Sequence, residues 1–168
     1  FDLDPIALWD PYTFNSLTNP SSVIDYNFKT KEKTVKKEQE VLDFNFDKNN
    51  YTSKRVWATA RDGVKVPMSI VYKKGIKLDG TNPVLQYAYG SYGSTIDPYF
   101  STIRLSLLDR GFIYVISHIR GSEYLGRPWY EDGKLLKKMN TFTDFIDSFK
   151  YLIENKYTSP KHLYAMGG

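Results

Sequence analysis

Residues 112–117, Phe-Ile-Tyr-Val-Ile-Ser, are apolar almost without alternation. A half-buried antiparallel strand alternates apolar and polar residues, whereas a parallel strand covered on both faces does not. The run therefore predicts a buried strand. Further strands are predicted at residues 83–89 and from residue 162 onward, so the fold class we expect is α/β, an open sheet with helices between its strands.

Two helices are predicted between these strands. Asp97 and Pro98 form an N-cap with proline at the first helical position, and apolar residues follow at helical spacing until Gly111. Thr141 and Asp144 resemble a capping box that opens a second helix. Its predicted apolar face comprises Phe142, Phe145, Ile146, Phe149, Leu152 and Ile153.

The pattern of strand and turn signals in the sequence changes near residues 51–55. Before this point, runs at residues 12–17, 22–28 and 34–41 are separated by turn signals, which suits antiparallel strands of a small sheet. Their spacing resembles one blade of a propeller, although only one copy is present. After it, Asp62 and Gly63 predict a tight turn between two further strands.

Three segments are expected at the carboxyl ends of the parallel strands, where ligands of open α/β sheets bind. They are residues 89–94, residues 119–126, and the pair Gly167 and Gly168. A glycine pair after a strand satisfies half of the rule for a nucleophile elbow, which needs small residues around a strained serine. Alone, such a pair is more often an ordinary turn or the start of a phosphate loop than a nucleophile elbow.

The tyrosine-rich segment 87–93 offers a second candidate feature. A tyrosine hydroxyl at a strand end can donate to a developing oxyanion in acyl transfer. From composition alone, however, packing tyrosines with hydroxyls at the rim are the better interpretation. Residues 119–123 and 129–134 are assigned equally to a solvated loop with an anchoring Trp and to a substrate contact.

His118 is interpreted as a structural histidine, because it follows a buried strand and has no carboxylate at a diagnostic spacing. The second histidine, His162, is distant in the sequence, and cysteine is absent. No disulfide, metal site or cofactor is therefore expected.

Charge and hydropathy indicate neither a nucleic-acid nor a membrane partner. The net charge of +4 comes largely from residues 29–37, which we interpret as a solvated hairpin turn. No apolar run approaches the length of a membrane span. Since no initiator Met is present, the native start is expected upstream; the localisation stays open, with the lack of cysteine favouring cytoplasm over periplasm.

Six ordered motifs over residues 55–168 closely resemble the prolyl oligopeptidase family of serine peptidases. They lie at residues 61–67, 87–93, 118–121, 129–134, 140–144 and 157–168. The forms Tyr-Ala-Tyr-Gly-Ser-Tyr-Gly and Trp-Tyr-Glu-Asp-Gly-Lys resemble its oligopeptidase B branch, also called protease II. One departure is residues 120–123, Arg-Gly-Ser-Glu, where the family often has Arg-Gly-Gly before the acidic residue.

The resemblance implies two domains and several residue roles. Residues 1–54 would be the last blade of a β-propeller, and residues 55–168 the N-terminal portion of an α/β-hydrolase domain. Tyr89 would contribute its hydroxyl to the oxyanion hole, Tyr92 would lie beside the specificity pocket, and Gly167 and Gly168 would precede the catalytic serine. No triad member would then lie in this chain.

The implied function is hydrolysis of short peptides after Arg or Lys through an acyl-enzyme, by a parent protein of which this segment alone is inactive. The alternatives are a post-proline oligopeptidase and a non-catalytic interaction module of hydrolase fold. The expected partners are short peptides. We also expect the segment alone to self-associate through an open sheet edge or uncovered helix faces.

Overall fold

The computed structural model describes residues 9–42 and 46–168. Its strands are β1 (Trp9–Phe14), β2 (Ser22–Asn27), β3 (Lys33–Glu38), β4 (Tyr51–Thr59), β5 (Lys65–Lys73), β6 (Val84–Ala88), β7 (Ile113–Ser117) and β8 (Leu163–Gly167). Its α-helices are α1 (Thr102–Asp109), α2 (Arg127–Glu131) and α3 (Met139–Glu154). The predicted N-terminal part includes residues 1–8 and 43–45, which lie outside the described residues.

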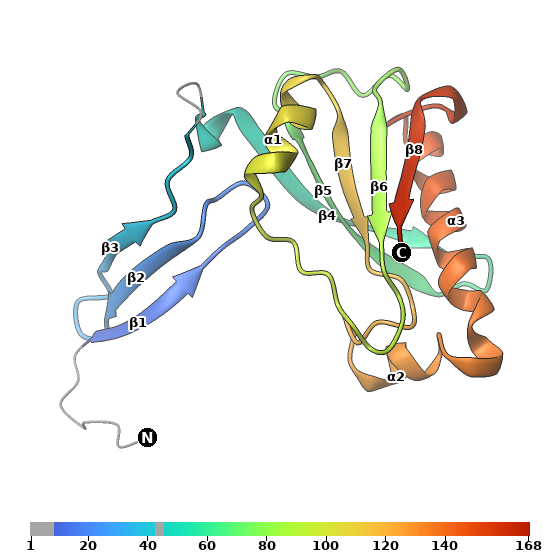
Figure 1. Cartoon of the computed structure of the whole chain (residues 1–168), viewed down its shortest axis with the longest axis horizontal. Helices are drawn as coiled ribbons and strands as arrows, with labels where there is room; N and C mark the ends of the chain where they lie inside the picture. Colours follow the sequence, from blue (N-terminus) through green and yellow to red (C-terminus); the bar gives the residue numbers. More distant parts are fainter. Residues whose placement is uncertain (1–8, 43–45) are drawn as a thin grey trace.

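The strands form two sheets (Figure 1). The smaller is antiparallel, in the order β1-β2-β3, and the larger has the order β4-β5-β7-β6-β8. In the larger sheet β6 is parallel to both β7 and β8, while β4, β5 and β7 form antiparallel pairs. Helix α1 connects β6 to β7, and α3 lies between β7 and β8, so the predicted β-α-β-α-β run is confirmed.

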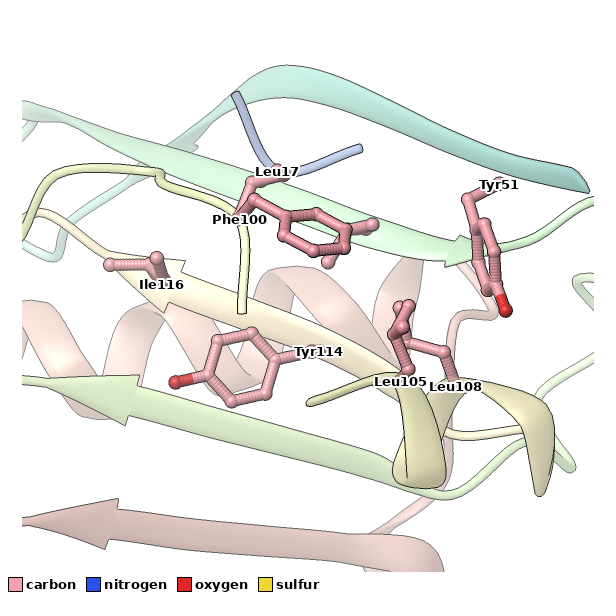
Figure 2. Packing of buried hydrophobic residues seen from close by; sticks show 8 residues of the cluster. Leu17, Tyr51, Phe100, Leu105, Leu108, Tyr114 and Ile116 are labelled. Atoms are coloured by element: carbon pink, nitrogen blue, oxygen red, sulfur yellow. The ribbon is translucent and has the colours of Figure 1, made fainter. Parts of the chain in front are cut away.

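Strand β7 is buried along its whole length, as the apolar run predicts. Its alternate side chains lie in different cores: Ile113 and Val115 pack beneath α3, and Tyr114 and Ile116 pack beneath α1. Figure 2 shows the core beneath α1. A strand between two helical layers has no polar face, which explains why its sequence does not alternate.

The small sheet is joined to the α1 core by the segment that follows β1. Leu17 is buried in that core. The Asn15 side-chain oxygen accepts a hydrogen bond from the backbone N–H of Phe100 at 2.8 Å. This contact fixes the chain ahead of α1.

The predicted start of the first helix is wrong. Asp97 and Pro98 lie in an irregular segment, and α1 begins at Thr102 with Ser101 as its N-cap. The reason is tertiary: the N–H of Phe100 bonds to Asn15, and the Phe100 ring enters the core.

The predicted capping box is also wrong. Helix α3 begins at Met139, so Thr141 and Asp144 lie inside it. Both side chains are buried and bond to groups of the loop after β7. The apolar face that was predicted for α3 is only partly covered, because Phe142 and Ile146 are exposed.

The antiparallel strands before residue 50 are confirmed, although β1 begins three residues earlier than predicted and β3 takes up part of the lysine-rich segment. The hairpin of β4 and β5 is confirmed as well, and Gly63 has φ +85° in its turn. Strand β4 begins at Tyr51; the domain boundary at residue 54 stays a prediction.

Candidate active site

The ends of β6 and β8 meet at the carboxyl edge of the larger sheet. Ala88, the last residue of β6, pairs with Gly167 in the parallel register. Tyr89 follows directly, and Tyr89, Gly167 and Gly168 line one cavity of about 270 Å³. The structure therefore brings together the residues that the sequence singled out at these two strand ends.

Tyr89 is half-buried, and its hydroxyl makes no hydrogen bond to any other residue that the structure describes. Gly167 is closely approached, since a Cβ at this position would lie 3.0 Å from the carbonyl oxygen of Ala88. Tyr89 therefore lines the cavity with a hydroxyl that no described residue engages.

Tyr92 lies in a neighbouring hollow of about 310 Å³, whose lining includes Tyr130 and Gly133. It is 89% exposed and has φ +56°, a left-handed conformation that is uncommon for a residue with a Cβ. Ser91 and Lys138 line both hollows and separate the one with Tyr89 from the one with Tyr92.

Three glycines bring the loops of this edge into backbone contact. A Cβ on Gly121 would lie 2.1 Å from the carbonyl oxygen of Gly90, and a Cβ on Gly133 would lie 2.1 Å from the nitrogen of Gly121. Gly121 also has φ +97°. Only glycine fits at these contacts without displacing backbone.

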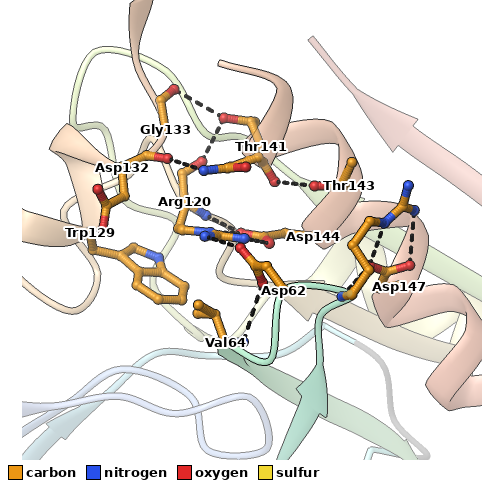
Figure 3. A network of polar contacts seen from close by, with 12 residues as sticks. Asp62, Val64, Arg120, Trp129, Asp132, Gly133, Thr141, Thr143, Asp144 and Asp147 are labelled. Carbon is orange, nitrogen blue, oxygen red and sulfur yellow. Dashed lines mark hydrogen bonds and ion pairs between the residues drawn. The ribbon is translucent and has the colours of Figure 1, made fainter. Parts of the chain in front are cut away.

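Thr141 joins the same three loops from the first turn of α3. Its hydroxyl lies 2.7 Å from the carbonyl oxygen of Arg120 and 3.2 Å from that of Gly133 (Figure 3). It also lies 3.4 Å from the carbonyl oxygen of Gly90. The local spacing of Thr141 predicts a helix cap, and these contacts to three loops are not visible in the sequence. A side chain that bonds to segments 8 to 51 residues away leaves no local pattern.

A buried ion pair anchors the loop after β7. The guanidinium of Arg120 donates to both carboxylate oxygens of Asp144, at 2.9 and 2.6 Å, and to Asp62 at 2.7 Å (Figure 3). These hydrogen bonds raise the pKa of Arg120, and the bond from Arg120 lowers the pKa of Asp62. Asp62 lies in the β4–β5 turn, so this turn and α3 hold the loop between them.

A second ion pair connects the same turn to α3. Arg61 donates to Asp147 from both its backbone N–H and its side chain, at 2.8 and 2.9 Å. The side-chain bond is the main reason that the pKa of Asp147 lies well below its usual value.

His118 lies just after β7 and is buried. Its Nε2 is 2.8 Å from the hydroxyl of Ser69, and its ring stacks on Tyr124. Burial lowers its pKa to about 3, with a smaller contribution from the charge of Arg55. The imidazole is therefore neutral and has no carboxylate partner among the described residues, as expected of a structural histidine.

Trp129 anchors the segment after β7 to the protein interior, which agrees with the prediction of a loop with an anchoring Trp. It lies in the short helix α2, is buried, and donates from its indole nitrogen to the carbonyl oxygen of His118 at 3.0 Å. The charged residues around it form ion pairs at the surface, such as Arg127 with Glu131. The loop that the sequence predicted here therefore contains a helical turn.

The family model that matches this chain is described as the prolyl oligopeptidase family and covers residues 98–168. The chain is 48% identical over 161 residues to dipeptidyl aminopeptidase BI of Pseudoxanthomonas mexicana, and the match covers 95% of this chain and 22% of that protein. Protease 2 of Moraxella lacunata is 44% identical over 155 residues, and the match covers 92% of this chain and 22% of that protein. The chain belongs to the prolyl oligopeptidase family.

The solved structures of this family agree in fold. Oligopeptidase B from Trypanosoma brucei, with covalently bound antipain, has a TM-score of 0.86 and 42% identity, covering 96% of this chain and 23% of that one. Oligopeptidase B from Leishmania major has a TM-score of 0.85 and 40% identity, and the match covers 96% of this chain and 22% of that one. The predicted fold class is confirmed. The chain spans about a fifth of the length of these relatives.

The described residues contain neither a metal cluster nor a membrane-spanning helix. Within residues 9–42 and 46–168, no three His, Cys, Asp or Glu side chains are grouped in a way that could hold a metal ion. Over the same residues, every helix is too short or too polar to cross a lipid bilayer.

Proposed function

We propose that this chain is part of a serine oligopeptidase that cleaves short peptides after Arg or Lys through an acyl-enzyme. The observation that carries the proposal is the cavity at the carboxyl edge of the sheet, lined by Gly167, Gly168 and Tyr89, whose hydroxyl has no partner among the described residues. Membership of a peptidase family supports it, as do the names of relatives such as protease 2 and oligopeptidase B.

The proposed role of Tyr89 is to donate a hydrogen bond to the oxyanion of the tetrahedral intermediate. Such a donor accelerates acyl transfer because it is aimed in advance at charge that develops in the transition state. Gly167 and Gly168 would lead into the nucleophile elbow, with the nucleophilic serine expected next in the parent protein. Tyr92, exposed on the neighbouring hollow, would contact the substrate side chain.

We further propose that these 168 residues alone do not hydrolyse peptides. Two serines contact a histidine in the described part of the chain, Ser69 with His118 and Ser159 with His162. Neither histidine has a carboxylate partner there, and the first pair is buried. Neither pair offers an activated nucleophile.

The test uses the full-length protein and peptide amides that differ at one position, with Arg, Lys or Pro before the scissile bond. Each peptide is offered with a free and with an acetylated N-terminus, because one relative is named a dipeptidyl aminopeptidase. Products are identified by mass spectrometry. Cleavage after Arg and Lys, with either N-terminus, is the expected result.

Other outcomes would change the proposal in defined ways. Cleavage after Pro alone would favour the post-proline alternative, which agrees with the prolyl endopeptidase of Elizabethkingia meningoseptica at 36% identity. Cleavage confined to free N-termini, two residues in, would indicate an aminopeptidase. A folded protein that cleaves none of the peptides and does not react with a serine-directed fluorophosphonate would contradict the proposal and favour a non-catalytic module.

A further inference from the structure

Lys138 bonds to the two residues that follow Tyr89. Its ammonium nitrogen lies 2.5 Å from the carbonyl oxygen of Gly90 and 2.7 Å from the hydroxyl of Ser91. Lys138 is the N-cap of α3, so these bonds connect the start of that helix to the loop after β6. In the sequence Lys138 is not distinguished from its neighbours Lys134 and Lys137.

The charge of Lys138 is not explained by an ion pair. Its neighbours Lys134 and Lys137 pair with Glu131 and Asp132, at 2.5 and 2.6 Å. Lys138 has no carboxylate within 4 Å among the described residues, and burial lowers its pKa.

Its place in α3 is also unfavourable for a cation. The N-terminus of a helix carries partial positive charge, and α3 has no acidic residue in its first turn. A residue that breaks such local rules commonly serves a contact of another kind, here the one to Gly90 and Ser91.

The bonded atoms lie where the backbone of Tyr89 needs support. The parallel ladder of β6 ends at Ala88, which pairs with Gly167. One side of Gly90 is fixed by packing, since a Cβ there would lie 2.8 Å from the carbonyl oxygen of Arg120. The closest hydrogen bond to the Gly90 carbonyl comes from Lys138, because Thr141 is 3.4 Å away. Tyr89 is therefore held between the ladder on one side and this bond on the other.

We propose that Lys138 is a positioning residue: by holding Gly90 and Ser91, it keeps the hydroxyl of Tyr89 where the oxyanion forms. This inference rests on the proposed function. It assigns Lys138 no contact with substrate, although Lys138 lines the cavity of Tyr89. A displacement of about 1 Å in such a group can lower a rate roughly 100-fold.

The experiment compares variants of the full-length protein in steady-state kinetics. Lys138→Met is expected to lower kcat about 10- to 100-fold with KM changed less than about 3-fold, since only the transition state uses the oxyanion contact. Lys138→Arg, which keeps the charge and the donors, should recover part of the rate. Lys137→Met is the matched control on the adjacent exposed lysine and should leave both parameters unchanged.

A double variant tests whether Lys138 acts through Tyr89. In a Tyr89→Phe background, Lys138→Met should cost less than about 3-fold in kcat, because the hydroxyl that it positions is already gone. Equal losses in both backgrounds would overturn the inference. So would a raised KM at constant kcat, which would mean that the ammonium binds substrate. If Lys138→Met does not fold, Ser91→Ala replaces it and should lower kcat with KM unchanged; an unchanged kcat would count against the inference.

Hydrogen exchange gives a reading that does not depend on activity. Lys138→Met should exchange faster in the peptide covering residues 88–94 and at the wild-type rate in the β4–β5 hairpin. If the wild-type protein is inactive but Lys138→Met still exchanges faster over residues 88–94, the proposed function is rejected and the contact between Lys138 and this loop is supported. Unchanged exchange over residues 88–94 would reject the contact itself, whatever the activity.

Discussion

The carbonyl oxygen of Gly90 packs directly on Gly121, so closely that a Cβ on Gly121 would lie 2.1 Å from it. The contact joins the loop after β6 to the loop after β7. It leaves no space for any side chain at position 121, and the positive φ of Gly121 disfavours one as well.

Gly121→Ala is therefore expected to destabilise the full-length protein by more than about 3 kcal/mol, because backbone strain and overpacking add. Gly63→Ala is the control: Gly63 has a similar φ of +85°, but nothing lies within 4 Å of its added Cβ. This control should cost only about 1 to 2 kcal/mol. Urea unfolding of both variants measures the difference, and equal losses would mean that the Gly90 contact is unimportant.

Asp144→Asn tests the buried ion pair with Arg120. The substitution leaves a buried guanidinium with Asp62 as its remaining carboxylate, and breaking such a pair costs about 3 to 5 kcal/mol. Since Arg120 anchors the loop that packs on Gly90, the peptidase activity that we propose for the full-length protein should fall as well. Glu131→Gln is the control at an exposed ion pair and should leave the unfolding midpoint nearly unchanged. A stable Asp144→Asn variant would show that Asp62 alone satisfies Arg120.

The main strands could be predicted because their signals are local. Residues 112–117 are apolar without alternation and form β7, and Asp62 with Gly63 forms the turn between β4 and β5. The positions of Tyr89 and Gly167 beside each other also followed, since parallel strands end at the same edge.

The helix starts and the supporting contacts could not be predicted, because distant partners determine them. The backbone N–H of Phe100 bonds to Asn15, 85 residues earlier in the chain, and Phe100 therefore lies outside α1. Thr141 and Asp144 have the spacing of a capping box, yet they bond to the loop after β7. Lys138 acts on a carbonyl 48 residues away. Each of these polar side chains could cap a helix, face solvent or bond to a distant segment. Which of these it does depends on the contacts made in the folded chain.

His118 should make the stability of the folded protein sensitive to acid. Burial lowers its pKa to about 3, whereas in the unfolded chain the imidazole takes up a proton near pH 6.5. The unfolded state therefore binds more protons below about pH 6.5, and stability falls as the pH is lowered from there toward 3, by up to about 1.4 kcal/mol per pH unit. His118→Gln should flatten this slope in urea unfolding between pH 4 and 7. An unchanged slope in His118→Gln would contradict the assignment.

Tyr89→Phe removes a single oxygen atom from a residue that lines the same cavity as Gly167 and Gly168. Since that hydroxyl has no partner among the described residues, its loss should leave the unfolding midpoint unchanged. If the hydroxyl donates to the oxyanion, kcat should fall about 100- to 1,000-fold with KM nearly constant, because the bond is made only in the transition state. Tyr99→Phe is the control, at an exposed tyrosine outside the cavity. Full activity of Tyr89→Phe in the peptide assay would mean that another group stabilises the oxyanion, and Lys138 would then have no hydroxyl to position.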